Sequence, residues 1–200
     1  MTEPATQPTV LSFGLLDYAG PMDLLGFLDN TTRDDPKRWA RFNPHPKVVF
    51  EFTGKQFDVI MVPGGRGVRP NAIPKSLLHF LKAQFPGAKY VLSVCTGSWA
   101  LAQAGVIDGR RATTNKASFL TVVENSSKTI NWVRKARWVD DGTFWSASGV
   151  SAGIDMTVAW LEHVVGTQLT LEIRAVVEYT KAEQDNDEWA AYHGLVPKAA

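Results

Sequence analysis

The stretch that decides the fold is Tyr90-Val91-Leu92-Ser93-Val94-Cys95-Thr96-Gly97-Ser98. Its first five residues are mostly apolar and predict a short strand. A strand whose residues do not alternate between polar and apolar is buried on both faces, as in a parallel sheet covered by helices. Four small residues then lead directly into a helical pattern over Trp99–Val106. This strand, turn and helix predict an α/β protein.

A second strand of the same kind precedes this one. The apolar run Phe57-Asp58-Val59-Ile60-Met61-Val62 ends at Pro63-Gly64-Gly65. Further strands and helices alternate along the chain, which indicates a doubly wound, mostly parallel sheet with helices on both faces. The other predicted elements are strands at Val10–Gly14, Val48–Phe52 and Arg111–Thr114, a hairpin joining Asn131–Trp138 to Thr143–Ala147, and helices at Met22–Leu28, Leu77–Phe85, Phe119–Glu124, Ile154–Val165 (with Ser151 as its N-cap) and Leu169–Val177.

The length and composition describe one ordinary globular domain. Two hundred residues suffice for a single large core. We expect a flexible N-terminus over residues 1–9, one domain over 10–182, and a weakly patterned, loosely docked C-terminal tail over 183–200. The formal net charge of +1 gives no strong field, so we expect neither a nucleic acid nor a membrane as partner.

The single cysteine excludes an intramolecular disulfide and is typical of a reducing compartment. With no apolar run long enough to span a membrane and no secretory signal, we expect a cytoplasmic protein.

Cys95 is the first candidate for chemistry. It sits on a sharp turn from strand to helix, where small neighbours let a nucleophile project into a cleft. The N-terminus of the following helix favours a thiolate there. A buried structural cysteine explains the pattern about equally well.

Two other patterns join Cys95 at the carboxyl ends of the strands. Backbone amides of Gly65, beside Gly64, and of Thr96 could form an oxyanion hole, although a tight turn explains the glycines as well. Asp17 ends the first predicted strand and could supply a proton, although an exposed turn residue is the simpler interpretation. His45, His79, His163 and His193 show no metal-ligand spacing, so no metal site is expected.

Together these segments resemble the DJ-1/PfpI superfamily, specifically its isonitrile hydratase-like branch. The resemblance covers most of the chain from Val10 to about Lys181. The motifs that carry it are Leu16-Asp17-Tyr18-Ala19-Gly20-Pro21-Met22-Asp23, the run from Asp58 to Gly65, Ser93-Val94-Cys95-Thr96-Gly97-Ser98, Ala104-Gly105-Val106-Ile107-Asp108-Gly109-Arg110-Arg111-Ala112-Thr113-Thr114, and Ser148-Gly149-Val150-Ser151-Ala152-Gly153-Ile154-Asp155.

The resemblance implies a flavodoxin-like fold and a homodimer. It implies Cys95 as nucleophile, Asp17 as its acidic partner and Thr96 as the residue that follows the nucleophile. The implied reaction converts an isonitrile to an N-substituted formamide, and it needs no cofactor because both reacting groups are side chains.

The chain departs from the family pattern in two places. Asn115 follows Thr113-Thr114, where many relatives carry His, so we expect no Cys–His relay and no peptidase activity; we place Asn115 with the substrate-binding residues. The segment Asn30–Gln56 is also shorter than usual for the family.

Other functions remain open for the same thiol. One is a glyoxalase or deglycase activity on small oxoaldehydes. Another is a non-catalytic redox sensor in which Cys95 is oxidised, since an exposed thiolate suits oxidation as well as catalysis. The sensor half of a transcription regulator is not favoured, because no helix-turn-helix or basic patch is present.

Overall fold

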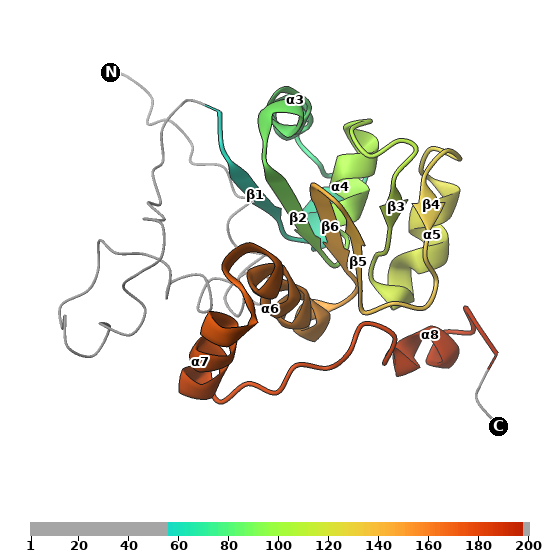
Figure 1. Ribbon diagram of the computed structural model, residues 1–200. Helices are drawn as coiled ribbons and strands as arrows, with labels where there is room; N and C mark the ends of the chain where they lie inside the picture. Colours follow the sequence, from blue (N-terminus) through green and yellow to red (C-terminus); the bar gives the residue numbers. More distant parts are fainter. Residues whose placement is uncertain (1–55, 198–200) are drawn as a thin grey trace, which may run out of the picture.

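A four-stranded sheet forms the centre of the protein. The computed structural model describes residues 56–197. Its strands lie in the order β1 (Val59–Val62), β2 (Tyr90–Val94), β6 (Phe144–Ala147) and β5 (Trp138–Asp141). The first three are parallel, and β5 runs antiparallel to β6 (Figure 1). The mixed α/β fold with a mostly parallel sheet is therefore confirmed.

The central strand β2 matches the predicted bounds because its sequence suits burial on both faces. Leu92 and Val94 are fully buried on one face and Val91 is buried on the other. Ser93 pairs in register with Val62 on one side and Ser146 on the other. The predicted strand at residues 57–62 is also confirmed, shortened to β1.

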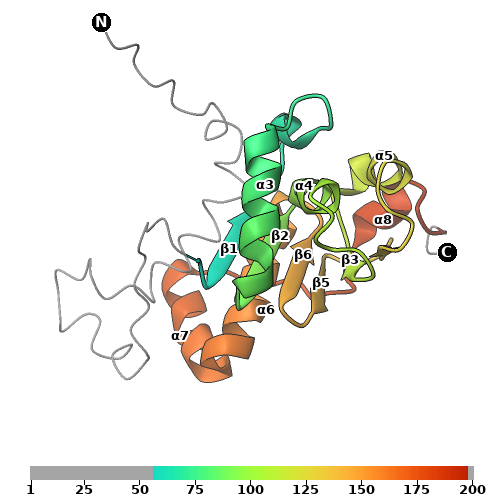
Figure 2. The same ribbon diagram turned by 90° about the horizontal axis from the view of Figure 1, so that it is seen from above.

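Helices cover both faces of the sheet, as predicted. Helices α3 (Lys75–Gln84) and α4 (Gly97–Gln103) pack on one face, with α4 contacting β1 and β2. Helices α6 (Val150–Val165) and α7 (Thr167–Val177) lie on the other face, as Figures 1 and 2 show. Each face has its own apolar core.

The predicted strand over Asn131–Trp138 is wrong, because this segment divides between two sheets. Its start, β4 (Asn131–Trp132), pairs in parallel with β3 (Arg111–Ala112), and the Val133 amide donates to the Ala112 carbonyl. Its end joins β5 in the hairpin with β6. The predicted turn of that hairpin is confirmed at Gly142, whose φ is +75°.

Short helical elements complete the described chain. Helix α5 has the predicted bounds, whereas α4 begins two residues earlier than predicted and ends at Gln103. The elements not yet given are η3 (Arg66–Val68), η4 (Phe85–Gly87), η5 (Lys116–Ser118), α5 (Phe119–Glu124) and α8 (Glu188–Tyr192).

Ser151 is not the N-cap of α6. The cap position is Gly149, and no side chain accepts a hydrogen bond from the first turn. Ser151 lies inside that turn, and its Oγ instead accepts a hydrogen bond from Arg137 Nη2 at 3.3 Å. The serine cannot cap the helix because α6 already begins at Val150, before the apolar stripe that marks it in the sequence.

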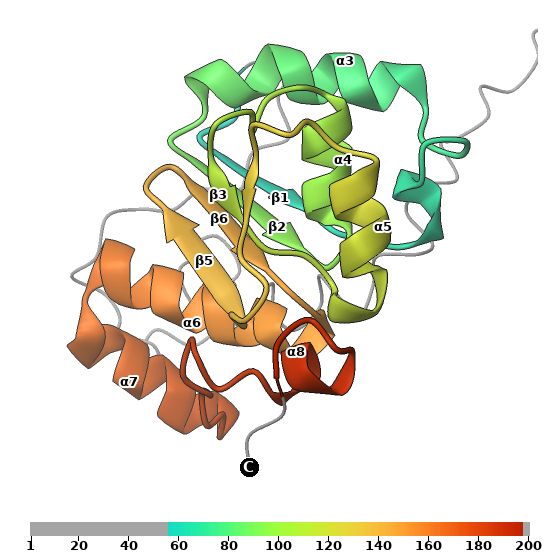
Figure 3. The same cartoon turned by 90° about the vertical axis from the view of Figure 1, so that its right-hand side faces the viewer.

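The C-terminal segment is not loosely docked, contrary to expectation. Ala190 of α8 and Leu195 are buried against Phe119 of α5, and the two helices lie side by side in Figure 3. Asp187 forms an ion pair with Lys116, 3.3 Å apart, and their side chains are only 1% and 3% exposed. Such a pairing across the fold leaves no periodic signal in the sequence.

Several expectations lie outside the described residues. They are the N-terminus over 1–9, the strands Val10–Gly14 and Val48–Phe52, and the helix Met22–Leu28. Within 56–197, no helix is long and apolar enough to cross a membrane. In the same part of the chain, no group of His, Cys, Asp or Glu side chains is arranged to hold a metal ion.

The Lys116–Asp187 pair yields a test of this docking. Lys116→Met leaves the Asp187 carboxylate buried without its countercharge, so the free energy of unfolding in urea falls by about 3–5 kcal/mol. The double variant Lys116→Met/Asp187→Leu recovers much of that loss, because no buried charge remains. A double variant no more stable than the single one contradicts this account.

Candidate active site

Cys95 occupies a turn with unusual backbone geometry between β2 and α4. Its φ is +58°, in the left-handed region that non-glycine residues rarely adopt. The Cys95 amide donates to the Ala147 carbonyl at 3.0 Å, and its own carbonyl accepts from Thr114 Oγ1 at 3.1 Å. The strained residue is thus held from two sides, and its side chain is half-buried.

Two glycines allow this turn to pack against the end of β1. A Cβ on Gly97 would lie 2.0 Å from the Val62 carbonyl oxygen. A Cβ on Gly64 would lie 2.6 Å from the Thr96 nitrogen and 2.8 Å from the Cys95 Cβ. The structure therefore brings Gly64, Cys95 and Thr96 together, and the close approach requires both glycines.

Thr96 links the turn to Gly65. The Gly65 amide donates to Thr96 Oγ1 at 3.0 Å, and the same hydroxyl lies 3.4 Å from the Gly65 carbonyl oxygen. In this arrangement the Gly65 amide proton is engaged by the threonine, rather than directed at a ligand. An oxyanion role for Gly65 therefore requires the Thr96 side chain to turn away, and it stays a prediction.

Asn115 lies one residue beyond the contact between Thr114 and Cys95. Its Oδ1 accepts the Ser118 amide at 3.3 Å and so begins η5, and the side chain is half-buried. Asn115 also lines a cavity of about 210 Å³. Cys95 is not among the described residues that line this cavity, and the substrate-binding role of Asn115 stays a prediction.

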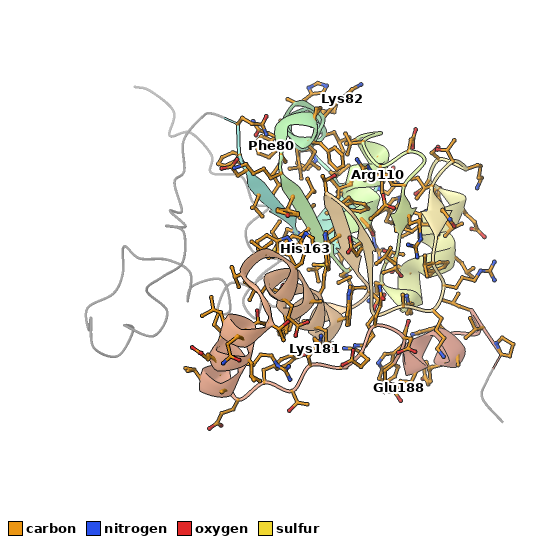
Figure 4. All side chains as sticks on the ribbon, viewed as in Figure 1. Phe80, Lys82, Arg110, His163, Lys181 and Glu188 are labelled. Carbon is orange, nitrogen blue, oxygen red and sulfur yellow. The ribbon has the colours of Figure 1, made fainter. Side chains whose placement is uncertain are left out.

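The remaining candidates are dispersed or lie outside the described residues. Asp17 falls in the part of the chain that is not described. His163 on α6 stands beside Tyr90, with its Nε2 3.2 Å from the tyrosine hydroxyl (Figure 4). His79 and His193 are exposed on other elements, so the described histidines do not gather at one site.

The sequence matches the DJ-1/PfpI family over residues 41–163, more than half of the chain. The chain belongs to the DJ-1/PfpI family. This match includes the turn at Cys95, the two glycines that pack against it and the contact from Thr114.

The chain is similar to the isonitrile hydratase of Pseudomonas putida. It is 37% identical over 176 residues, spanning 84% of this chain and 74% of the relative. A regulator named HTH-type transcriptional regulator GbdR from Pseudomonas aeruginosa is 23% identical over 188 residues, and the chain spans about half of its length (50%).

Solved structures agree on the fold. A ThiJ/PfpI family protein from Pseudomonas syringae superposes with a TM-score of 0.60 at 21% identity, covering 90% of this chain and 83% of that one. The described part of this DJ-1/PfpI protein therefore has the architecture of that family.

Sequence reasoning missed a buried carboxylate that joins three segments. Asp155 of α6 is fully buried and pairs with Arg137, accepting from its Nε at 2.8 Å. It also accepts from the Tyr179 hydroxyl at 2.9 Å and from the Ala182 amide at 2.8 Å. The available signal was an acidic residue on the otherwise apolar face of a predicted helix.

This network makes the protein less stable at alkaline pH. Burial, and then the hydrogen bond to Asp155, raise the pKa of Tyr179 above its ordinary value of 10.0. Above that pH the unfolded chain loses the phenol proton while the folded chain keeps it, so the free energy of unfolding falls as pH rises. Below it the contribution is fully present.

We therefore expect Tyr179→Phe to be less stable than the native chain near neutral pH and to lose stability less steeply above pH 10.0. The measurement is urea unfolding across pH. Tyr192→Phe, at a side chain 72% exposed, is the control and keeps the native slope. Equal slopes in all three proteins would contradict the assignment.

The close packing at the turn gives a second expectation. Gly97→Ala forces the new Cβ against the Val62 carbonyl, a backbone atom that cannot rotate away, and costs at least about 2 kcal/mol of unfolding free energy. Gly67→Ala is the matched control, because a Cβ there meets nothing within 4 Å. Unfolding of the two variants by urea compares them directly, and similar stabilities refute the packing argument.

Proposed function

We propose that this protein is a cofactor-independent, isonitrile hydratase-like hydro-lyase with Cys95 as its nucleophile. The observation that carries the proposal is the 37% identity with the Pseudomonas putida isonitrile hydratase across 84% of the chain. The strained turn at Cys95 supports it, because a φ of +58° persists only where the surrounding structure enforces it.

The reaction balances with side chains and water alone. The Cys95 thiolate attacks the terminal carbon of R–N≡C, forming a C–S bond, while Asp17 donates a proton to that carbon. The resulting thioimidate, R–N=CH–S–Cys, takes up water at the same carbon. The C–S bond then breaks, the thiolate leaves and the product is R–NH–CHO, so one water has been added and the proton of Asp17 is restored from it.

The geometry suits this role for Cys95. The hydrogen bonds from the amide and to the carbonyl fix the backbone at the turn, which supports a Cys95 side chain that is oriented before substrate arrives. Thr96 and Gly64 border the same turn, and we assign them with Gly65 to the surroundings of the reacting carbon. We also propose that the protein is cytoplasmic and acts as a homodimer. Light scattering of the purified chain would test the homodimer.

The direct test is formamide production from a small aliphatic isonitrile, followed by NMR. Cys95→Ala removes the nucleophile and lowers kcat by at least about a thousandfold. Asp17→Asn removes the proton donor and lowers kcat by at least about a hundredfold, while Cys95 still reacts with iodoacetamide. Circular dichroism confirms that each variant is folded.

Two outcomes would overturn the proposal. Undiminished turnover in Cys95→Ala removes the nucleophile from the mechanism. Cysteine-dependent loss of methylglyoxal, with isonitriles untouched, assigns the glyoxalase or deglycase activity to the same thiol instead. If neither substrate reacts but mild peroxide oxidises Cys95, as mass spectrometry can show, the redox-sensor function takes its place.

A further inference from the structure

The cavity that Asn115 lines is built by segments far apart in the sequence. Its walls come from the start of η5, from Arg137 before β5, from the first turn of α6 and from α8. The volume of about 210 Å³ is enough for a small molecule or for one end of a larger one. The C-terminal segment closes one side through Trp189 and His193.

The first turn of α6 brings unused hydrogen-bond donors to this cavity. The helix is sixteen residues long, and the amides in its first turn have no partner inside the helix. No side chain caps them, and two of the residues that carry them, Ser151 and Ala152, line the cavity. A helix N-terminus of this kind favours negative charge.

Ser148 is an independent sign of a ligand. It lines the cavity, is only 5% exposed, and its backbone amide donates to the Arg137 carbonyl. No residue between 56 and 197 forms a hydrogen bond with its hydroxyl. The hydroxyl is therefore available to hydrogen-bond an oxygen of a ligand in the cavity.

The side chains that line the cavity include basic groups but no described carboxylate. Lys116, Arg137 and His193 line it, and none of the described residues that do so is Asp or Glu. Lys116 and Arg137 are ion-paired with Asp187 and Asp155, neither of which lines the cavity. Arg137 still has spare donors, because its printed partners engage Nε and Nη2, whereas Nη1 is bonded to nothing within the described chain.

One further acidic residue nearby stays outside the cavity. Glu188, on the same helix as Trp189, is exposed on the outside of the molecule (Figure 4) and does not line the cavity. The cavity therefore offers backbone amides, a serine hydroxyl and a guanidinium, a donor set that matches an oxyanion.

We propose that this cavity binds the carboxylate or phosphate group of a small molecule, held by Ser148, the first turn of α6 and Arg137. Carboxylates and phosphates present the same acceptor oxygens, and the experiment separates them. The proposal does not require Cys95, which is not among the described residues that line the cavity.

The test is an NMR titration of the full, ¹⁵N-labelled chain with sodium acetate and, separately, with sodium phosphate, at ionic strength held constant with sodium chloride. We expect saturable shifts of the Ser151 and Ala152 amides. Saturation by acetate alone assigns a carboxylate ligand, saturation by phosphate alone assigns a phosphate, and saturation by both supports the shared oxyanion chemistry.

Matched variants connect the binding to the cavity. Ser148→Ala removes a hydroxyl that has no partner in the described chain, so the protein folds and its affinity for the anion falls about tenfold. Ser93→Ala is the control, since it removes a serine hydroxyl that is buried in β2, away from the cavity, and leaves affinity unchanged. Cys95→Ala also binds normally, which separates this site from the proposed catalysis.

Two results would overturn the proposal. One is the absence of saturable shifts with either anion at millimolar concentrations. The other is an affinity in Ser148→Ala equal to that of Ser93→Ala, because the anion is then held somewhere other than this cavity.

Discussion

The close approach of α4 to the end of β1 is the constraint on which the rest of the structure depends. Only a residue without a side chain can stand where Gly97 meets the Val62 carbonyl. The chain must therefore turn sharply at the end of β2, and the backbone of Cys95 adopts a left-handed φ of +58° at this turn. The register of β1 with β2 keeps the facing strand end in place. Sheet, helix and candidate nucleophile are thus positioned by one contact.

Buried charges tie the outer segments to this centre. Asp155 joins α6 to Arg137 and to the chain that follows α7. Lys116 joins the segment after Thr114 to the C-terminal segment, and it also donates to Thr113 Oγ1 at 2.7 Å. Burial lowers the pKa of Lys116, while the Asp187 carboxylate raises it. Since Thr114 contacts the Cys95 carbonyl, the C-terminal residues are connected to the turn through a short series of contacts.

Much of the fold could be predicted because its signals are local. The apolar run of β2 predicts the strand, and the small residues of the turn predict where it ends. The predicted bounds of α5 equal the observed ones. The family and the fold followed from the order of such segments. Cys95, Gly64 and Thr96 could be grouped from sequence because they stand at the ends of adjacent parallel strands.

The errors fall where distant residues decide the outcome. Residues 131–138 contain enough β-forming residues for one strand, but two different partners divide them. Ser151 has the chemistry of a cap, but α6 begins one residue before it, and its oxygen accepts from Arg137 instead. The engagement of the Gly65 amide by Thr96, and the cavity around Ser148, depend on side-chain positions that no pattern of residue types records.

The pairing of Lys116 with Asp187 also orders events during synthesis. All four strands of the described central sheet, the last of which ends at Ala147, are synthesised before Asp187. Until then the Lys116 ammonium has no buried carboxylate to meet, and its segment stays hydrated. Closure around Lys116 therefore waits until Asp187 has been synthesised, whereas every described strand of the central sheet precedes Asp187 in the chain.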